Sequence, residues 1–268
     1  MGSSTPMSDA KQLLGHVLNI PPANTVLIDS ALTPSEYNTM QAFVKRRLAG
    51  EPVAYIIGSW DFYDVTLAVN TSTLIPRPET EEMVDAILRQ HGDTPMRVLD
   101  LGTGCGAIAL ALAKHRLSWQ VYGVDKVFEA VNCAADNVKA LGLSKRVVMQ
   151  QKDWYHDKIL GVFDIIVTNP PYIAKDDVDI AQEVLLYEPE SALFSEDEGL
   201  ADALYILNLA RSHLVNGGWL YMEHGWTQSV KLLSAARRLG FVNIDCYRDV
   251  QGRDRYLACQ YVLDADAK

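Results

Sequence analysis

One segment constrains the fold of this chain more than any other: a predicted strand that runs directly into a glycine loop. Residues 98–106 read VLDLGTGCG, and a helix is predicted over 106–116. Glycines at alternate positions let the backbone turn tightly and let a ligand approach where no Cβ stands in the way. The first N–H groups of the following helix have no partner within that helix. The segment therefore predicts a parallel α/β sheet with a ligand bound where its first strand ends.

The chain alternates in the same way beyond this segment. Strands are predicted over 97–101, 121–124, 147–150, 163–168 and 219–223, and helices over 106–116, 127–141, 200–214 and 227–239. This alternation is typical of a parallel sheet with helices on both faces. Two last strands, over 242–247 and 255–262, are joined by a turn that contains Gln251 and Gly252. We therefore expect an antiparallel hairpin to close the sheet.

The first part of the chain has a different character. Residues 8–50 are predicted to be helical, and TPSE at 33–36 has the pattern of a capping box. A short β-hairpin is predicted within 53–75, and a helix capped by Thr80 over 80–90. We expect two domains, over 7–75 and 76–268. Residues 1–6 resemble a cloning remnant, with Met7 as a candidate natural start.

Charge and cysteine spacing weigh against several classes of function. The chain has 24 Lys and Arg against 34 Asp and Glu, so its formal net charge is −10, whereas a DNA-binding face needs an excess of basic residues. The four cysteines form no CxxC pair and match no zinc pattern, so we expect no metal and reduced thiols in a cytoplasmic protein. No apolar run approaches the roughly 20 residues that span a bilayer, so we expect no membrane contact.

An acidic residue follows the glycine loop at the end of the next predicted strand. Asp125 stands where a carboxylate can accept two hydrogen bonds from a ribose diol. The loop and this acid together predict a site for a nucleoside cofactor. Three interpretations of the loop remain open: a methyltransferase site, a tight turn without a ligand, and a dinucleotide site, because Gly102, Gly104 and Ala107 also fit the loose dinucleotide fingerprint.

The predicted strand over 163–168 ends in the tetrapeptide NPPY at 169–172. Asn169 lies at the carboxyl end of a buried strand, where such sheets bind ligands. Pro170 and Pro171 remove two N–H donors and leave carbonyls free to accept, and Tyr172 offers a flat face for stacking. This arrangement suits a planar substrate with an NH₂ group. The Asn169 side-chain oxygen and the Pro170 carbonyl would each accept one N–H, with the nitrogen lone pair turned toward the methyl group of a cofactor.

Several motifs carry a resemblance to known enzymes. The loop over 100–106, Asp125 and NPPY resemble the amino-methyltransferases that use S-adenosylmethionine. RRLAGEPVAYIIG at 46–58 and LIPRPETE at 74–81 resemble signatures of the PrmC/HemK glutamine methyltransferases. So do YEP at 187–189 with Ala192 and Leu193, and Asp249 with GRDR at 252–255. The motifs follow the order of that family over about residues 11–262.

The resemblance implies a fold and an activity. The fold is a class I S-adenosylmethionine-dependent methyltransferase, an α/β Rossmann-like seven-stranded sheet with a C-terminal antiparallel hairpin behind a small N-terminal helical domain. Residues 7–75, with the hairpin as linker, would recognise the substrate. The family transfers a methyl group from S-adenosylmethionine to the side-chain N5 of the glutamine in the Gly-Gly-Gln motif of class I peptide chain release factors, and releases S-adenosylhomocysteine. We expect such an enzyme to act as a monomer.

The resemblance also assigns roles to individual residues. The cofactor would contact Gly102, Thr103, Gly104, Cys105, Gly106, Asp125, Asp153, Trp154 and Asn169. The substrate would contact Arg77, Pro78, Glu79, Asn169, Pro170, Pro171 and Tyr172, of which Asn169, Pro170 and Tyr172 would be catalytic. Cys105 stands where the family often has Ser or Thr, so its oxidation could interfere with the cofactor.

Some charged residues have more than one interpretation. An interdomain ion pair is the other interpretation of Arg77 and Glu79. Glu188 either closes over the pocket or caps a helix. Arg253 and Arg255 are expected to pair with Asp249 in the closing hairpin.

Other functions remain open at this point. Relatives of the family methylate a glutamine of a large-subunit ribosomal protein, and the catalytic core does not distinguish the two substrates. The acidic charge and the lack of a target-recognition domain disfavour a nucleic-acid adenine N6-methyltransferase. The intact NPPY tetrapeptide disfavours an accessory protein of translation that binds the cofactor without catalysis.

Overall fold

A seven-stranded sheet forms the centre of the molecule. The computed structural model describes residues 5–263, so residues 1–4 of the expected cloning remnant lie outside the described residues. The strands are β3 (Arg97–Leu101), β4 (Gln120–Asp125), β5 (Val147–Gln151), β6 (Phe163–Thr168), β7 (Leu214–Glu223), β8 (Val242–Arg248) and β9 (Asp254–Gln260).

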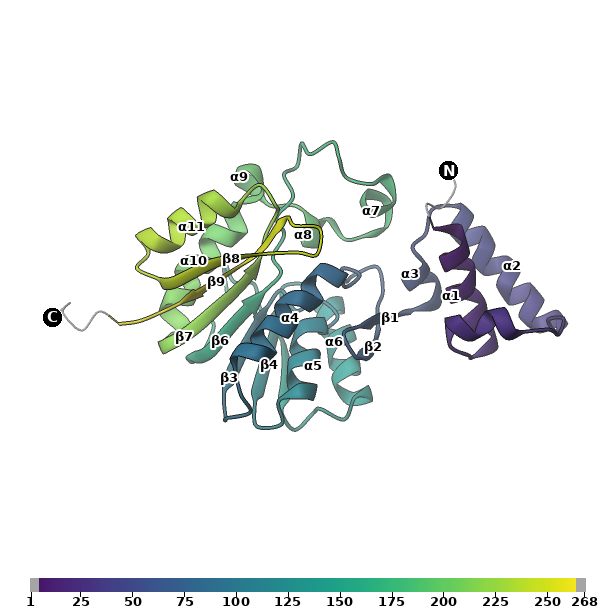
Figure 1. Cartoon of the computed structure of the whole chain (residues 1–268), viewed down its shortest axis with the longest axis horizontal. Coiled ribbons are helices and arrows are strands. Elements are labelled where there is room, and N and C mark those ends of the chain that lie inside the picture. Colours follow the sequence, from purple (N-terminus) through teal and green to yellow (C-terminus); the bar gives the residue numbers. More distant parts are fainter. Residues whose placement is uncertain (1–4, 264–268) are drawn as a thin grey trace.

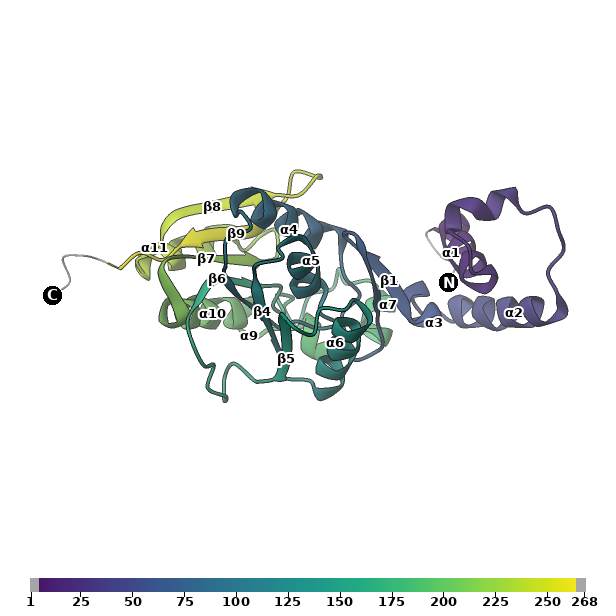
Figure 2. The same ribbon diagram turned by 90° about the horizontal axis from the view of Figure 1, so that it is seen from below.

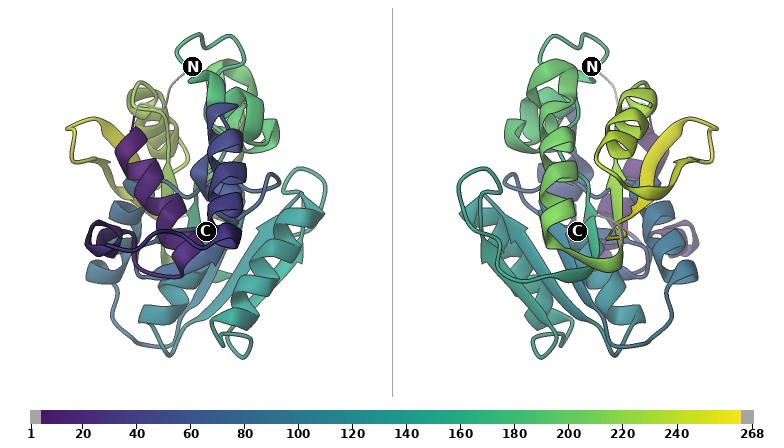
Figure 3. Two further views of the ribbon diagram at one scale, coloured as in Figure 1. Left: turned by 90° about the vertical axis from the view of Figure 1, so that its right-hand side faces the viewer. Right: turned by 90° about the vertical axis from the view of Figure 1, so that its left-hand side faces the viewer.

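The order of the strands in space is β5-β4-β3-β6-β7-β9-β8. Strands β3 to β7 pair in parallel, whereas β9 runs antiparallel to both β7 and β8. Figure 3 shows the yellow β8–β9 hairpin and the teal strands at opposite edges of the sheet. The predicted α/β fold class, with seven strands and a closing antiparallel hairpin, is therefore confirmed.

Helices cover both faces of the sheet (Figure 1). α4 (Pro78–Gln90), α5 (Ala107–His115) and α6 (Phe128–Ala140) pack on one face, and α10 (Ala201–His213) and α11 (Ser229–Arg238) on the other. Successive side chains of a strand point to opposite faces. In β6, Ile165 and Val167 belong to the first core and Ile166 to the second, and all three are fully buried. Within residues 5–263, no helix is long and apolar enough to cross a membrane.

Several local predictions need correction. α4 begins at Pro78, with Arg77 as its N-cap, because proline is preorganised for the first helical position. Thr80 therefore lies inside the first turn and does not cap the helix. β7 begins at Leu214, well before the predicted start at residue 219, because Leu214 pairs with Phe163 beyond a bulge. Short helices α7 (Gln182–Tyr187), α8 (Glu190–Leu193) and α9 (Glu196–Gly199), which no pattern predicted, fill the connection after β6.

The first helices form a small unit beside the sheet. α1 (Pro6–Leu18), the 3-10 helix η1 (Pro22–Leu27), α2 (Pro34–Leu48) and α3 (Val53–Ile57) project from the rest of the chain, as Figure 2 shows. The predicted capping box is present, because Thr33 Oγ1 accepts from the Glu36 N–H and Glu36 accepts from the Thr33 N–H. The core of this helical unit is small. It consists of buried Leu13, Val53 and Ile56, with Met40, Phe43 and Ile57 packed against them.

The predicted hairpin connects the helical unit to the sheet. It consists of β1 (Ser59–Phe62) and β2 (Val65–Ala68), which pair antiparallel. Phe62, Val65 and Leu67 are buried in the core that α4, α5 and α6 share. The hairpin therefore packs with the sheet rather than with the helices that precede it. The division of the chain at residue 75 stays a prediction.

Candidate active site at the carboxyl edge of the sheet

The glycine loop after β3 has a backbone that other residues adopt only with strain. Gly102, Gly104 and Gly106 have φ angles of 73°, 55° and 89°. A Cβ on Gly106 would lie 2.9 Å from the side chain of Leu110, so this position also lacks space. The N–H groups of Gly102 and Thr103 both donate to the carbonyl of Val124 at the end of β4. The loop is thus fixed against the neighbouring strand.

Asp125 joins this loop to the start of the next connection. Its carboxylate accepts from the Gly104 N–H and from the Val127 N–H, both at 2.9 Å. Burial raises the pKa of Asp125. Each carboxylate oxygen has a second lone pair, so Asp125 keeps acceptor capacity toward a ligand.

Asp100 is a site residue to which the sequence analysis gave no role. It lies in β3 directly before the loop, is fully buried, and accepts from the Thr103 hydroxyl at 2.7 Å and the Ala109 N–H at 3.2 Å, both through Oδ2. Its Oδ1 is buried without a hydrogen-bond partner among the described residues. Burial raises the pKa of Asp100 to about 7. An acid inside an otherwise apolar predicted strand was the signal for it.

A cleft lies against the loop. Predicted cofactor residues at its wall are Gly102, Thr103, Gly104, Cys105, Asp125, Trp154 and Asn169. Gly106 and Asp153 do not line it. Asp153 instead accepts from the Tyr155 N–H in a local turn. The ring of Trp154 lies 3.4 Å from the position that a Cβ on Gly102 would occupy. The indole Nε1 of Trp154 donates to Asp202.

A second cleft adjoins the first. The two share Leu74, Arg77, Asn169 and Ala192 in their walls. Tyr172 lines the second cleft alone, whereas Pro171 lines the first. Asn169 therefore stands where a group in one cleft can meet a group in the other. The predicted substrate residues Pro78, Glu79 and Pro170 line neither cleft.

The side chain of Asn169 is held on one side only. Its Nδ2 donates to Thr80 Oγ1 at 3.3 Å. Across the described part of the chain, no group donates to Asn169 Oδ1 or to the Pro170 carbonyl, so both acceptors predicted for an NH₂ substrate are unused. The Tyr172 hydroxyl donates to Glu223 at 3.2 Å, and burial together with that carboxylate raises the pKa of Tyr172.

Glu223 is a second residue that the sequence analysis missed. It ends β7, is 1% exposed, and accepts from both the Thr80 hydroxyl, at 2.6 Å, and the Tyr172 hydroxyl. Burial raises the pKa of Glu223. The available signal was a glutamate at the carboxyl end of a predicted strand, the same position that Asn169 has in β6.

Arg77 and Glu188 form an ion pair beside the clefts. Arg77 Nη2 lies 2.6 Å from Glu188 Oε1, and the other oxygen of Glu188 accepts from the Ile75 N–H. The Glu188 side chain is 2% exposed, whereas that of Arg77 is 33% exposed. Arg77 thus pairs with Glu188 rather than with Glu79. Glu188 anchors the end of α7 against the wall of the clefts.

The remaining predicted contacts lie around the site. Arg255 donates to Asp249 Oδ2 through Nε, at 3.2 Å, and Nη2, at 3.0 Å, as expected, whereas Arg253 reaches Asp249 through its backbone N–H. Cys105 is buried, and burial raises the pKa of its thiol to about 12, so the thiol stays protonated at neutral pH. No group of three or more His, Cys, Asp or Glu that could hold a metal ion occurs in residues 5–263.

Solved structures share the fold. A methyltransferase from Pyrococcus furiosus superposes with a TM-score of 0.55 at 16% identity, covering 83% of this chain and 98% of that chain. The ribosomal protein L11 methylase from Lactobacillus delbrueckii subsp. bulgaricus superposes with a TM-score of 0.51 at 24% identity, covering 70% of this chain and 81% of that chain. At these identities the likeness shows the fold alone.

Sequence comparisons identify the family. The PrmC N-terminal domain matches residues 1–58, and the methyltransferase small domain matches residues 80–198. The release factor glutamine methyltransferase of Aliivibrio fischeri is 39% identical over 265 residues, which cover 98% of this chain and 93% of the relative. That of Shewanella oneidensis is 42% identical over 251 residues, which cover 92% and 86%. The chain therefore belongs to the release factor glutamine methyltransferase family.

Proposed function

We propose that this protein transfers a methyl group from S-adenosylmethionine to the side-chain N5 of the glutamine in the Gly-Gly-Gln motif of class I release factors. One observation carries the proposal beyond family membership. Asn169 Oδ1 accepts no hydrogen bond from the described residues, and Asn169 lines both adjoining clefts. The carbonyl of the next residue, Pro170, is likewise an unused acceptor within residues 5–263, although Pro170 itself lines neither cleft. A primary amide has two N–H donors and matches this pair.

The residues around the glycine loop fit the cofactor. Gly102 and Gly104 open the backbone to a ligand, and Asp125 keeps lone pairs for ribose hydroxyls. Asp100, beneath the loop, has a buried oxygen without a hydrogen-bond partner among the described residues, and Asp125 adds a carboxylate at the wall of the cleft. Trp154 forms a flat apolar wall of the same cleft, suited to a nucleobase. When bound, S-adenosylmethionine supplies a methyl group on a positively charged sulfur.

The substrate amide would enter through the second cleft, past Arg77 and Tyr172. Asn169 Oδ1 and the Pro170 carbonyl accept its two N–H groups, which turns the nitrogen lone pair toward the first cleft. Both acceptors stabilise the positive charge that develops on the nitrogen. The nitrogen gains the methyl group and releases one proton, so the product is an N5-methyl amide.

The helical unit would serve recognition of the protein substrate. It contacts α7, because Arg47 of α2 lies 3.4 Å from Glu183, and the next residue of α7, Val184, lines the substrate cleft. Residues 7–75, with the hairpin as linker, would form the recognition domain and residues 76–268 the catalytic domain. We expect the enzyme to act as a monomer in the cytoplasm.

The test is transfer to a purified class I release factor in the presence of S-adenosylmethionine, with the modified peptide mapped by mass spectrometry. We expect one methyl group on the Gly-Gly-Gln glutamine. Asn169→Ala should lower kcat by about 10²–10³-fold, as for other oriented hydrogen-bonding groups, and leave the Kd of the cofactor near that of the wild type. Asn208→Ala, at an exposed position of α10, is the matched control.

A parallel reaction with large-subunit ribosomal protein distinguishes the second candidate substrate. Faster transfer to that protein would make it the substrate in place of release factors. The proposed reaction, methyl transfer to a glutamine amide, would stay the same. Cofactor binding without transfer to either protein would overturn the proposed activity.

A further inference from the structure

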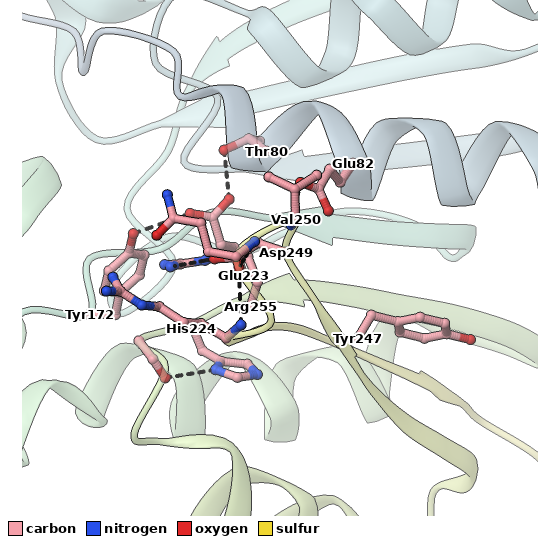
Figure 4. Close-up of polar contacts among 12 residues, drawn as sticks. Thr80, Glu82, Tyr172, Glu223, His224, Tyr247, Asp249, Val250 and Arg255 are labelled. Carbon is pink, nitrogen blue, oxygen red and sulfur yellow. Dashed lines mark hydrogen bonds and ion pairs between the residues drawn. The ribbon is translucent and has the colours of Figure 1, made fainter.

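A chain of hydrogen bonds connects Asn169 to a buried carboxylate outside the NPPY tetrapeptide. Asn169 Nδ2 donates to Thr80 Oγ1, and the Thr80 hydroxyl donates to Glu223 Oε2 at 2.6 Å. The second oxygen of Glu223 accepts from the Tyr172 hydroxyl. Figure 4 shows Thr80, from α4, and Tyr172, after β6, meeting at Glu223. Three separate elements thus contribute to one network.

The direction of this chain follows from the donors and acceptors available. An ionised carboxylate can only accept, so the single proton of the Thr80 hydroxyl points to Glu223. The Thr80 oxygen can then only accept from Asn169, and the NH₂ end of the Asn169 amide is its only donor. Asn169 Oδ1 must therefore point away from Thr80, as acceptance of a substrate N–H requires.

The direction of the hydrogen bonds from Asn169 through Thr80 depends on whether Glu223 is ionised, and the charged groups around Glu223 influence its ionisation. Arg255, on β9, and the Tyr172 hydroxyl favour the ionised carboxylate, whereas burial and Glu79, on α4, oppose ionisation. Arg255 is itself held by Asp249. Protonated Glu223 could donate to Thr80, whose hydroxyl would then be free to donate to Asn169 Oδ1 and reverse the amide.

We propose that Glu223 is a positioning residue, which through Thr80 fixes the Asn169 amide with its oxygen toward the substrate. The expected effect on kcat rests on the proposed function. The orientation of the Asn169 amide rests on the hydrogen bonds alone. Glu223 lines neither cleft, so its effect is on the orientation of Asn169.

The first test compares variants in the full-length protein with saturating cofactor and release factor. Glu223→Gln keeps the volume of the side chain but offers Thr80 an oxygen in only one of two amide orientations, so kcat should fall about tenfold. Thr80→Val should lower kcat at least as much, and Thr80→Ser should restore it. Glu82→Gln, also on α4 and bonded to the Val250 N–H of the hairpin turn, is the matched control and should leave kcat unchanged.

The pH profile separates positioning from a merely structural role. Because the ionised form of Glu223 is the active one, wild-type kcat should fall as the pH is lowered through its raised pKa. Glu223→Gln should lack that acidic limb, and calorimetry should show an unchanged Kd for S-adenosylmethionine. A Glu223→Gln variant with wild-type kcat and the wild-type acidic limb would overturn the inference.

A second readout needs no protein substrate. The side-chain NH₂ signals of Asn169, assigned by their loss in Asn169→Ala, should shift in NMR spectra as Glu223 titrates. They should stay constant over the same pH range in Glu223→Gln. Signals that titrate identically in both proteins would overturn the inference. If the wild type transfers no methyl group but its Asn169 signals follow Glu223, the proposed function fails and the positioning role stands.

Discussion

The helical unit and the sheet differ in how much core each contains. The helical unit buries Leu13, Val53 and Ile56 and leaves Leu27 and Leu48 exposed, at 77% and 67%. The sheet has a continuous apolar core on each face. In one of these cores, seven consecutive residues of α5 are buried. Reacting groups must be held in fixed positions, and dense packing provides this because it limits the displacement of side chains. Exposed apolar residues suit contact with another protein. The comparison supports the proposed division, with the chemistry at the sheet and the contact with the protein substrate at the helical unit.

Ion pairs also hold the helical unit together. Arg47 lies 2.6 Å from Asp9 of α1 and 3.4 Å from Glu183 of α7, with 13% of its side chain exposed. Arg46 pairs with Glu51 at 2.5 Å and also donates to the carbonyls of Tyr55 and Ile56. Such pairs set orientation more than stability, because part of each lies in water.

The largest effect should come from the same substitution made in both regions. Leu112→Ala in α5 should lower the free energy of unfolding by about 3–5 kcal/mol, because a rigid core keeps the cavity. Leu13→Ala in α1 should cost about 2 kcal/mol, because few neighbours surround it and they can close over the gap. Urea unfolding followed by circular dichroism measures both. Equal costs would show that the helical unit is packed as firmly as the sheet.

A smaller effect should appear in the pH dependence of stability, and it should come from the sheet. The pKa of Asp100 is about 7 in the folded protein against an ordinary 3.8, so the folded state binds a proton that the unfolded chain has released. The contribution of Asp100 to the free energy of unfolding should therefore fall as the pH rises from about 4 to about 7, and stay level above.

Urea unfolding between pH 5 and 8 tests this contribution. Asp100→Asn should flatten the curve in that range. Asp136→Asn is the control, because this carboxylate lies at an exposed position of α6, where it pairs with Lys139. A wild-type slope retained in Asp100→Asn would place the pH dependence elsewhere in the molecule.

The smallest effect should come from the contact between the two regions. Arg47→Ala removes the pairs to Asp9 and Glu183 and should raise the KM for the release factor about threefold, with kcat and cofactor Kd unchanged, because exposed or partly exposed pairs are worth about 1 kcal/mol or less. Steady-state methyl transfer measures it, with Lys45→Ala on the exposed side of α2 as control. A fall in kcat instead would mean that the helical unit helps to hold the reacting groups.

Sequence patterns predicted those parts of the fold and site that have a local signal. The apolar strands, the glycine loop and the capping box at Thr33 each depend on neighbouring residues, and the structure contains them all. The NPPY tetrapeptide directly follows β6, as expected. The bonds from Thr80 and Tyr172 to Glu223 depend on how α4 packs over the ends of β6 and β7. The pairing of Arg77 with Glu188 depends in the same way on the connection that holds α7. No local pattern encodes such contacts.

The bond between Thr80 and Glu223 has a consequence for the order in which the protein acquires activity. It joins residues 143 positions apart, so it forms only after most of the chain has left the ribosome and a long loop has closed. The glycine loop and the NPPY tetrapeptide are synthesised earlier. A nascent chain thus contains the residues of the cofactor site before Glu223, which is proposed to orient the Asn169 amide, is made. If Glu223 has the proposed positioning role, full activity therefore depends on a contact that forms late in folding.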